Sequence, residues 1–341
     1  MARSARDYDE SDVRIRPARR GSRPRTKDRP AHADAVPGRV VTVDRGRYTT
    51  LVGDGSGEHV VSAMRARELG RKGIVVGDRV RLVGDVSRAE GSLARIVRVE
   101  PRASVLRRTA DDTDPVERVV VANADQLVVV SALADPEPRP RLIDRCLVAA
   151  YDAGMDPLLV LTKADLADPA PFLAQYTPLS VPHVVTATVD GGTDGLQAVR
   201  EALSGRTSVL VGHSGVGKST LVNALVPDAG RATGVVNDVT GRGRHTSTSA
   251  IALALPDDSG WVIDTPGIRS FGLAHVDPAR IVEHFPDLEP GTAGCPRGCT
   301  HDEEECALDA WVASGQAGPS GPARLESLRR LLRTRTTAAG D

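Results

Sequence analysis

Aromatic residues, lysines and long apolar runs are scarce in this chain of 341 residues. Aromatic side chains make up 3% of it, and lysine occurs only at Lys27, Lys72, Lys163 and Lys218. No uninterrupted apolar run approaches the length of a membrane-spanning helix. The first residues, Met-Ala-Arg-Ser-Ala-Arg-Asp, lack the apolar core of a secretory signal. We therefore expect a soluble, cytoplasmic protein that has no contact with a membrane.

The basic residues are unevenly distributed, although the formal net charge is only -1. Residues 14–29 carry arginines and one lysine against a single acid, Asp28, with Pro and Gly between them. Such a composition predicts a disordered, Arg-rich tail over residues 1–37. Two interpretations stay open for this tail, a nucleic-acid-binding arm and a solvated segment without a partner.

Short β-segments follow the tail over residues 38–106. The clearest lie at 38–43, 48–52, 78–83 and 93–99, with Gly-Asp and Ser-Gly punctuation between them. This spacing predicts a small β-barrel of the oligonucleotide-binding (OB) kind. Tyr48 is its only aromatic residue, which excludes an extended base-stacking platform. Any RNA contact is expected to join arginines to phosphates, and the alternative is a charged face that is merely solvated.

From residue 107 to 274 the pattern changes to apolar strands that alternate with helices. The apolar strands are expected at 126–131, 157–161, 184–187, 208–211 and 261–264. Near-continuous apolar strands of this kind predict an α/β domain with a mainly parallel sheet covered on both faces. Residues 275–341 are expected to form a separate helical domain around a cysteine cluster.

The strongest motif is a phosphate-binding loop. Gly212 to Ser219 matches G-x-x-x-x-G-K-S, follows an apolar strand and opens a helix, so backbone N–H groups can point at phosphates. We predict that Lys218 reaches the β- and γ-phosphates and takes part in catalysis, and that the Ser219 hydroxyl binds Mg²⁺. The predicted contacts are Gly212, His213, Ser214, Gly215, Val216, Gly217, Lys218, Ser219 and Thr220.

Two further strings complete a guanine-nucleotide site. Asp264-Thr265-Pro266-Gly267 ends an apolar strand, where Asp264 would orient Mg²⁺ through water and the Gly267 amide would bind the γ-phosphate. Thr162-Lys163-Ala164-Asp165 is predicted to bind guanine, because one carboxylate, that of Asp165, can accept the two donors that guanine offers and adenine lacks. The Ala187 amide is expected to contact the guanine O6.

The order of these strings differs from that of an ordinary small GTPase. The guanine-binding string ends at Asp165, before the phosphate loop begins at Gly212, whereas it normally follows the other two strings. We infer a circularly permuted P-loop GTPase domain. Thr162 stands where Asn is usual, so the hydrogen bonds of that Asn to neighbouring loops are expected to be weakened or remade.

Residues 241–248 are predicted to close over the γ-phosphate and the metal ion. Thr246 is the first candidate for a second Mg²⁺ ligand, and Thr248 is the alternative. Ile268 occupies the place of the usual catalytic glutamine and cannot orient water. His245 is therefore the candidate that positions or activates water, and the competing interpretation is a solvated loop histidine.

Three of the four cysteines cluster near the C-terminus. Cys295, Cys299 and Cys306 lie close in sequence with His301 between them, a Cys₃His set suited to one structural zinc ion. The alternative is a group of free, reduced cysteines. Cys146 stands apart and is expected to be a small buried apolar residue. The acids between the ligands, Asp302 to Glu305, are expected to face solvent.

From about residue 38 onward the chain resembles the RsgA (YjeQ) family of circularly permuted, ribosome small-subunit-dependent GTPases. Matching strings are Ile143-Asp144-Arg145, Gly243-Arg244-His245-Thr246 and Asp264 to Gly272. The resemblance implies an OB barrel, a permuted GTPase domain and a zinc-binding helical domain. It also implies rRNA binding and a GTPase that is stimulated by the small ribosomal subunit late in its maturation. The family spacing of zinc ligands is Cys-x₄-Cys-x-His-x₅-Cys, and both longer gaps are one residue shorter here.

Two rival functions stay open beside this hydrolase. One is a GTP-dependent RNA-binding module whose slow hydrolysis is incidental. The other is a P-loop kinase or ATPase, which Asp165 disfavours because adenine would leave its carboxylate unpaired. The expected partners are the small ribosomal subunit with its rRNA, and GTP or GDP. A monomer is expected.

Overall fold

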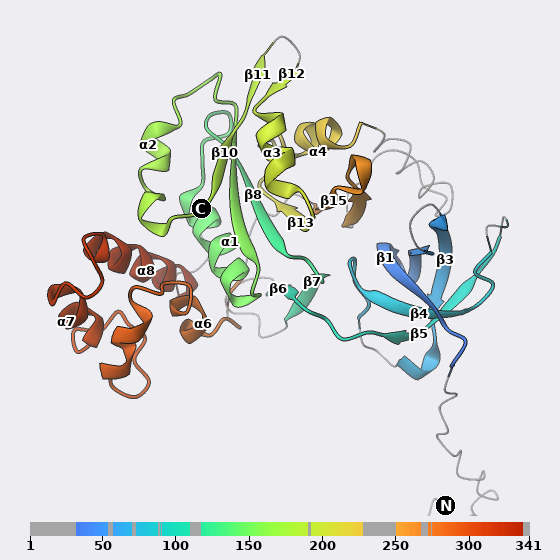
Figure 1. The fold of residues 1–341 in the computed structure, drawn as a ribbon, viewed down its shortest axis with the longest axis horizontal. Coiled ribbons are helices and arrows are strands. Elements are labelled where there is room, and N and C mark those ends of the chain that lie inside the picture. Colours follow the sequence, from blue (N-terminus) through green and yellow to red (C-terminus); the bar gives the residue numbers. More distant parts are fainter. Residues whose placement is uncertain are drawn as a thin grey trace, which may run out of the picture. The chain divides into compact units, whose positions relative to one another are not determined.

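The structure is a computed structural model, and it describes residues 32–53, 57–69, 73–87, 89, 91–109, 117–189, 192–227, 250–266, 272–273 and 275–336. Figure 1 shows a β-barrel, an α/β sheet and a set of C-terminal helices. The predicted fold class is confirmed in these parts. No helix among the described residues is long and apolar enough to span a membrane.

The barrel contains the strands β1 to β5. These are β1 (Val36–Asp44), β2 (Arg47–Val52), β3 (His59–Arg65), β4 (Arg79–Gly84) and β5 (Ala94–Val99), with the 3₁₀ turn η4 (Arg67–Leu69) after β3. They run in the order β1-β2-β3-β5-β4, and β4 pairs back with β1, which closes the barrel. Val40, Val80, Leu82 and Ile96 fill the interior and are completely buried. The predicted segments correspond to β1, β2, β4 and β5, and β3 completes the barrel.

The GTPase sheet has the order β10-β9-β8-β13-β15-β14. Its strands are β8 (Gln126–Ala132), β9 (Asp156–Thr162), β10 (His183–Val185), β13 (Arg206–Val211), β14 (Ile251–Ala254) and β15 (Gly260–Asp264). All pairs are parallel except that of β14 with β15. The sheet continues into the barrel through an antiparallel pairing of β14 with β1 at Ile251 and Thr42.

Helices cover both faces of this sheet. Along β8, Leu127 and Val129 belong to the core beneath α1 (Pro140–Asp152), whereas Val128 and Val130 belong to the core beneath α3 (Leu196–Leu203) and α4 (Lys218–Leu225). Alternate residues of one strand thus lie in opposite layers, and every residue of β8 is buried. This burial explains the continuous apolar sequence of the strand.

Smaller elements connect these layers. They are β6 (Val105–Arg108), β7 (Arg118–Ala122), α2 (Ala170–Leu173), η5 (Thr177–Leu179), β11 (Ala187–Val189), β12 (Gly192–Asp194) and η6 (Pro256–Asp258). β6 pairs with β7 and β11 with β12, each as an antiparallel pair outside the main sheet.

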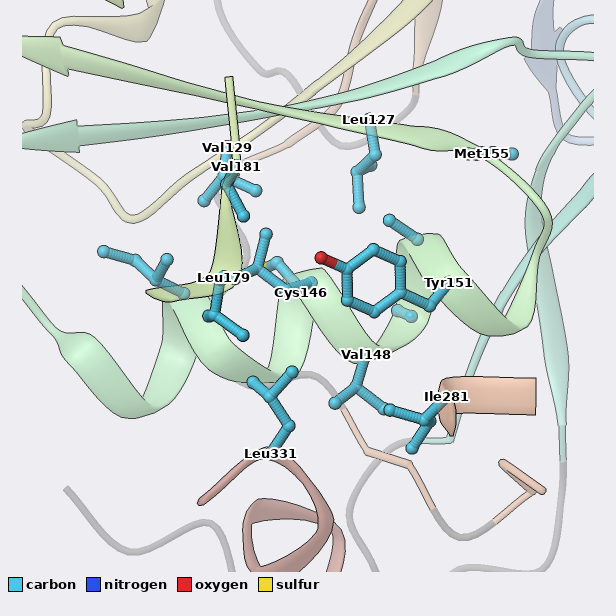
Figure 2. Close-up of a cluster of buried hydrophobic side chains, with 14 of the residues drawn as sticks. Leu127, Val129, Cys146, Val148, Tyr151, Met155, Leu179, Val181, Ile281 and Leu331 are labelled. Carbon is cyan, nitrogen blue, oxygen red and sulfur yellow. The ribbon is translucent and has the colours of Figure 1, made fainter. Parts of the chain in front are cut away.

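The C-terminal helices share a hydrophobic core with α1. They are α6 (Pro278–Val282), the 3₁₀ turn η7 (Glu289–Gly294), α7 (Ala307–Ala313) and α8 (Gly321–Thr336). Figure 2 shows Val148 of α1 facing Ile281 of α6, with Leu331 of α8 below the same helix. Cys146 lies in this core and is 1% exposed, as predicted, and burial raises the pKa of its thiol to about 12.

Candidate nucleotide site and metal centre

The three predicted nucleotide-binding strings meet at one edge of the parallel sheet. Thr162 ends β9, the phosphate loop follows β13, and Asp264 ends β15. The register pairs Ala132 with Thr162 and Leu210 with Asp264, so the carboxyl ends of these strands are level. Ligands of open parallel sheets bind outside such carboxyl ends. The order of the strings along the chain does not change this placement.

The phosphate loop turns sharply between β13 and α4. Gly215 and Gly217 have φ angles of +85° and +87°, a conformation that favours glycine. Gly212 packs against the backbone of β8, where an added Cβ would lie 2.5 Å from the Val130 carbonyl oxygen. These glycines bring the backbone N–H groups to the start of α4 at Lys218, where the partial positive charge of a helix N-terminus attracts phosphate.

The side chains of Lys218 and Asp264 lie in direct contact. The Lys218 ammonium donates hydrogen bonds to the Asp264 carboxylate and to the Thr265 carbonyl. Thr265 is fixed in turn, because its hydroxyl donates to the Leu210 carbonyl over 2.7 Å. The cation predicted to bind phosphate and the carboxylate predicted to orient hydrated Mg²⁺ therefore lie side by side. Ser219 is exposed at the first turn of α4, next to them.

Thr162 contacts the phosphate loop directly. Its hydroxyl donates a 2.6 Å hydrogen bond to the carbonyl of Val216, inside the loop. The string that is predicted to bind guanine is thereby tied to the string that is predicted to bind phosphate. We expected the replacement of Asn by Thr162 to weaken or remake the hydrogen bonds to neighbouring loops. The bond from Thr162 to Val216 is such a remade hydrogen bond.

Contacts between the 162–165 string and residues 186–188 hold the Asp165 carboxylate, which is predicted to bind guanine, in place. Lys163 has a left-handed backbone with φ of +60°, and its ammonium donates to the Asp135 carbonyl. The Thr188 amide donates to the Asp165 carboxylate over 3.1 Å, and the Ala164 amide donates to the Thr186 carbonyl. Ala187 therefore lies between Thr186 and Thr188, which both contact the 162–165 string.

Two of these contacts were not expected from the sequence. Asp135 and Thr188 belong to no recognised string. Asp135 follows β8, so its position after the carboxyl end of a central parallel strand was the available signal. The predicted residues His245, Thr246, Thr248 and Gly267 lie outside the part of the chain that the structure describes.

The predicted metal ligands converge. The ligand atoms of Cys295, Cys299, His301 and Cys306 all lie within 4.8 Å of one another. The Cys295 Sγ atom is 3.6 Å from His301 Nδ1 and 3.9 Å from Cys306 Sγ. Three thiols and one imidazole around such a small volume fit a tetrahedral zinc ion without an open position.

The backbone accommodates the shortened spacing of these ligands. Gly298 and His301 have φ angles of +82° and +67°, which make tight turns on both sides of Cys299. Burial raises the pKa of the Cys299 thiol to about 12 and lowers the pKa of the His301 imidazole. Each effect disfavours the charged form of its group, and a bound cation would reverse the preference of the thiol.

Of the acids between the ligands, Asp302, Glu304 and Glu305 are exposed, as expected, and Glu303 is half-buried. The Glu303 carboxylate accepts hydrogen bonds from the Thr300 amide over 2.9 Å and from the Cys299 thiol over 3.2 Å. Asp302 forms an ion pair with Arg333 of α8 over 2.7 Å. Both acids therefore shape the loop that carries the ligands, because short polar loops need such partners for their backbone groups.

A model of the RsgA GTPase family matches residues 99–274 of the chain. The chain is 37% identical over 282 residues to a small ribosomal subunit biogenesis GTPase RsgA of Gemmatimonas aurantiaca, which covers 81% of this chain and 90% of that protein. It is 41% identical over 268 residues to the protein of the same name from Pseudomonas syringae pv. tomato, covering 76% and 74% of the two chains. The chain belongs to the RsgA GTPase family.

Solved structures agree with this fold. The crystal structure of YjeQ from Thermotoga maritima has a TM-score of 0.61 at 26% identity and covers 89% of this chain and 99% of its own. The structure of YloQ, a circularly permuted GTPase, has a TM-score of 0.61 at 20% identity and covers 90% and 96% of the two chains. The second similarity supports the fold alone.

In this RsgA-family chain, arginines of α8 contact both the loop that carries the predicted metal ligands and the GTPase sheet layer. Arg329 donates to the His301 carbonyl over 3.0 Å and forms an ion pair with Asp309 over 2.6 Å. One residue further, Arg330 pairs with the buried Asp144 of α1 over 3.1 Å. Successive arginines therefore join the two parts from one helix.

Further contacts strengthen the junction of α8 with α1 and η5. Arg330 lies over the Tyr176 ring at 5.1 Å, and Arg145 donates to the Thr334 carbonyl over 2.6 Å. Burial raises the pKa of the Asp144 carboxyl to about 6, against the opposing effect of Arg330. The Ile143-Asp144-Arg145 string, which carries the family resemblance, thus docks the C-terminal helices.

Replacing Arg330 should destabilise the protein in a pH-dependent way. In Arg330→Gln the Asp144 carboxylate stays buried without its cation, and the Arg330 side chain is 34% exposed. We expect a loss of about 1–3 kcal/mol in the free energy of unfolding at pH 7.5, below the full cost of breaking a buried pair. Arg330 opposes the rise in the pKa of Asp144, so its removal raises that pKa further, above the value of about 6 in the parent. The loss should therefore shrink as the pH falls from this higher pKa to about 6, below which the carboxyl is protonated in both proteins.

Urea unfolding of the parent and of Arg330→Gln at pH 7.5 and pH 5 measures the loss in the free energy of unfolding at each pH. The control is Arg330→Gln in an Asp144→Asn background, where no charge is left unpaired and the loss should be smaller and the same at both pH values. Equal losses at both pH values in the single variant would show that the ion pair is not the cause.

Proposed function

We propose that this chain is a GTP hydrolase that acts in the biogenesis of the small ribosomal subunit, and that the subunit stimulates its hydrolysis. The observation that carries the proposal is the convergence of Asp165, Lys218 and Asp264 at the carboxyl edge of one sheet. Relatives that span nearly the same length bear the name of a small ribosomal subunit biogenesis GTPase. We propose a barrel over 38–106, a GTPase domain over 107–274, a zinc domain over 275–341, and a monomer in solution.

Guanine selection is assigned to Asp165. Its carboxylate can accept hydrogen bonds from N1–H and from the N2 amine of guanine, and it also accepts a hydrogen bond from the Thr188 amide. The Ala187 amide would contact O6. The Lys163 stem would lie along the ring, and Thr162 holds this segment against the phosphate loop through Val216.

Phosphate and Mg²⁺ binding is assigned to the other two strings. The loop amides from Gly212 to Thr220 and the Lys218 ammonium would bind the phosphates, with the Gly267 amide on the γ-phosphate. Ser219 and Thr246 would bind Mg²⁺ directly, with Thr248 as the alternative to Thr246, and Asp264 would hold a metal-bound water. The bound Mg²⁺ supplies charge neutralisation for the leaving phosphate.

The substitution Asp165→Asn tests this assignment and the proposed function together. The amide presents N–H donors to the donors of guanine, so GTP affinity should fall by at least about tenfold. Xanthosine triphosphate carries an acceptor at that position, so its affinity should rise. The measurement is single-turnover hydrolysis of both nucleotides with and without purified small ribosomal subunits.

The two parts of the proposal fail differently in this experiment. Subunit-stimulated hydrolysis of xanthosine triphosphate by Asp165→Asn supports both. Unchanged use of GTP by the variant contradicts the role of Asp165. Wild-type protein that hydrolyses GTP at one rate with and without subunits contradicts the proposed stimulation and favours the rival binding module.

His245 is proposed to position or activate the attacking water, because Ile268 cannot do so. The variant His245→Ala should bind GTP with unchanged affinity and lose about a hundredfold or more of subunit-stimulated turnover. Equilibrium binding of a fluorescent GTP analogue and single-turnover hydrolysis measure the two quantities. His183→Ala, which removes an exposed histidine of β10 outside the nucleotide-binding strings, is the matched control. Retained turnover in His245→Ala would remove the role.

We assign one structural zinc ion to Cys295, Cys299, His301 and Cys306. Such an ion would cross-link the loop. It would take no part in hydrolysis, because four protein ligands leave no open coordination position. The support for this assignment is the donor set and its separations within 4.8 Å.

Freshly purified protein should contain one zinc ion per chain by atomic emission spectroscopy. Cys299→Ala should lose the metal and lower the thermal unfolding temperature, since metal binding contributes directly to folding. The control is Cys146→Ala, which removes a buried thiol outside the cluster and should keep the metal. Metal-free wild-type protein, prepared without chelators, would contradict the assignment.

A further inference from the structure

A pocket of about 370 Å³ opens on the barrel beside strand β15, and it shares no residue with the nucleotide site. Its walls come from β1 and β4, from the stretch after β2, and from Trp261. Its charged and aromatic residues are Arg39, Glu58, Arg79, Arg81, Glu100 and Trp261. A pocket of this volume is in the range that binds small organic molecules.

Two arginines face each other across the strands of this pocket. Arg39 of β1 and Arg79 of β4 are direct partners in the antiparallel register. Like charges directly opposite in a sheet repel and destabilise the pair. Arg81 differs, because its guanidinium forms a 2.7 Å ion pair with the Glu100 carboxylate. Within the described part of the chain, no carboxylate forms an ion pair with Arg39 or Arg79.

Arg39 is held rigidly, and its hydrogen-bonding capacity is largely unused. Its guanidinium lies over the Trp261 ring at 4.8 Å, and one N–H group donates to the Thr207 hydroxyl over 3.1 Å. Burial and then repulsion from Arg79 lower the pKa of Arg39, while Asp125 and Glu58 act the other way. A guanidinium has five N–H donors and stays charged in proteins, so Arg39 offers further donors to the pocket.

We propose that this pocket binds a phosphate group carried by a nucleotide unit, either free or within an RNA chain. A phosphate between Arg39 and Arg79 would accept hydrogen bonds from both guanidinium groups and remove their repulsion. The remaining volume suits the attached sugar and base, with the Trp261 indole on one wall. Inorganic phosphate lacks the sugar and base that would contact the Trp261 wall, so it should bind more weakly than a nucleotide.

The site lies where the barrel meets the GTPase sheet. Trp261 belongs to β15, which ends at Asp264, and Thr207 belongs to β13, which leads into the phosphate loop. A ligand bound to Arg39 would therefore be linked through the Arg39 side chain to Trp261 and Thr207, on the two strands that position Asp264 and Lys218. This inference goes beyond the proposed function, because it assigns a second site that binding of GTP does not require.

Tryptophan fluorescence gives a local test. The chain has two tryptophans, Trp261 and Trp311, so Trp311→Phe leaves Trp261 as the only reporter. The full-length protein is saturated with GDP and Mg²⁺ and titrated with inorganic phosphate, adenosine monophosphate or a single-stranded ribohexanucleotide. Adenosine monophosphate cannot satisfy Asp165, which keeps the probe out of the guanine site. We expect a saturable change that weakens as salt is added.

Arg79→Gln should reduce the affinity for whichever of these probes binds by about tenfold or more, because one charge-assisted contact is lost. Arg79 is exposed and has no ion pair among the described residues, so the variant should fold. Arg95→Gln, an exposed arginine of β5 outside the pocket, is the matched control and should bind like the parent. Thermal unfolding checks that both variants are folded.

Each outcome decides the proposal. Arg79-dependent binding of adenosine monophosphate identifies a free nucleotide, and Arg79-dependent binding of the hexanucleotide alone identifies an RNA chain. Affinities that are equal in Arg79→Gln and Arg95→Gln overturn the site, as does the absence of binding by every probe. If Trp311→Phe unfolds, anisotropy of a labelled hexanucleotide and dialysis of labelled adenosine monophosphate give the same comparison with Trp311 retained. The proposed GTPase function is unaffected by either result.

Discussion

Parallel pairing of β9, β8, β13 and β15 is the constraint on which the rest of the structure depends. Parallel strands align their carboxyl ends, so every loop that follows one of them emerges at the same edge. Level register of Thr162 with Ala132 and of Leu210 with Asp264 holds the strings predicted to bind guanine and phosphate at the same edge of the sheet. The cut and rejoining of the chain is tolerated because the sheet, and not the chain order, assembles the site.

Much of this arrangement could be predicted from local sequence. The phosphate loop, the Asp264 string and the Cys₃His cluster each have their own residue spacing, and each was found where its flanking strand or loop required it. The barrel was predictable from short alternating strands, although β3 was not identified in advance. Its sequence His59–Arg65 lacks the clear Val and Arg alternation of β1 and β4.

The contacts that could not be predicted join residues far apart in the sequence. Thr162 meets Val216, Lys163 meets Asp135, and Arg330 meets Asp144, and each partner is chosen by tertiary packing. Arginines on α8 look alike in the sequence, so nothing local indicates that Arg329 contacts the loop of the predicted metal ligands while Arg330 contacts α1. A charged residue on a helix is usually exposed to solvent. The burial of Asp144 on α1 could therefore not be predicted from its residue type.

The hydrogen bond from Thr162 to Val216 has a thermodynamic consequence. A ligand pays for the conformational freedom that its binding site loses. Because one bond spans the guanine-binding segment and the phosphate loop, ordering either segment restrains the other. Under the proposed assignment of these segments, the two ends of a nucleotide share a single entropic cost, so guanosine and triphosphate joined in one molecule should bind more tightly than the sum of their separate free energies indicates.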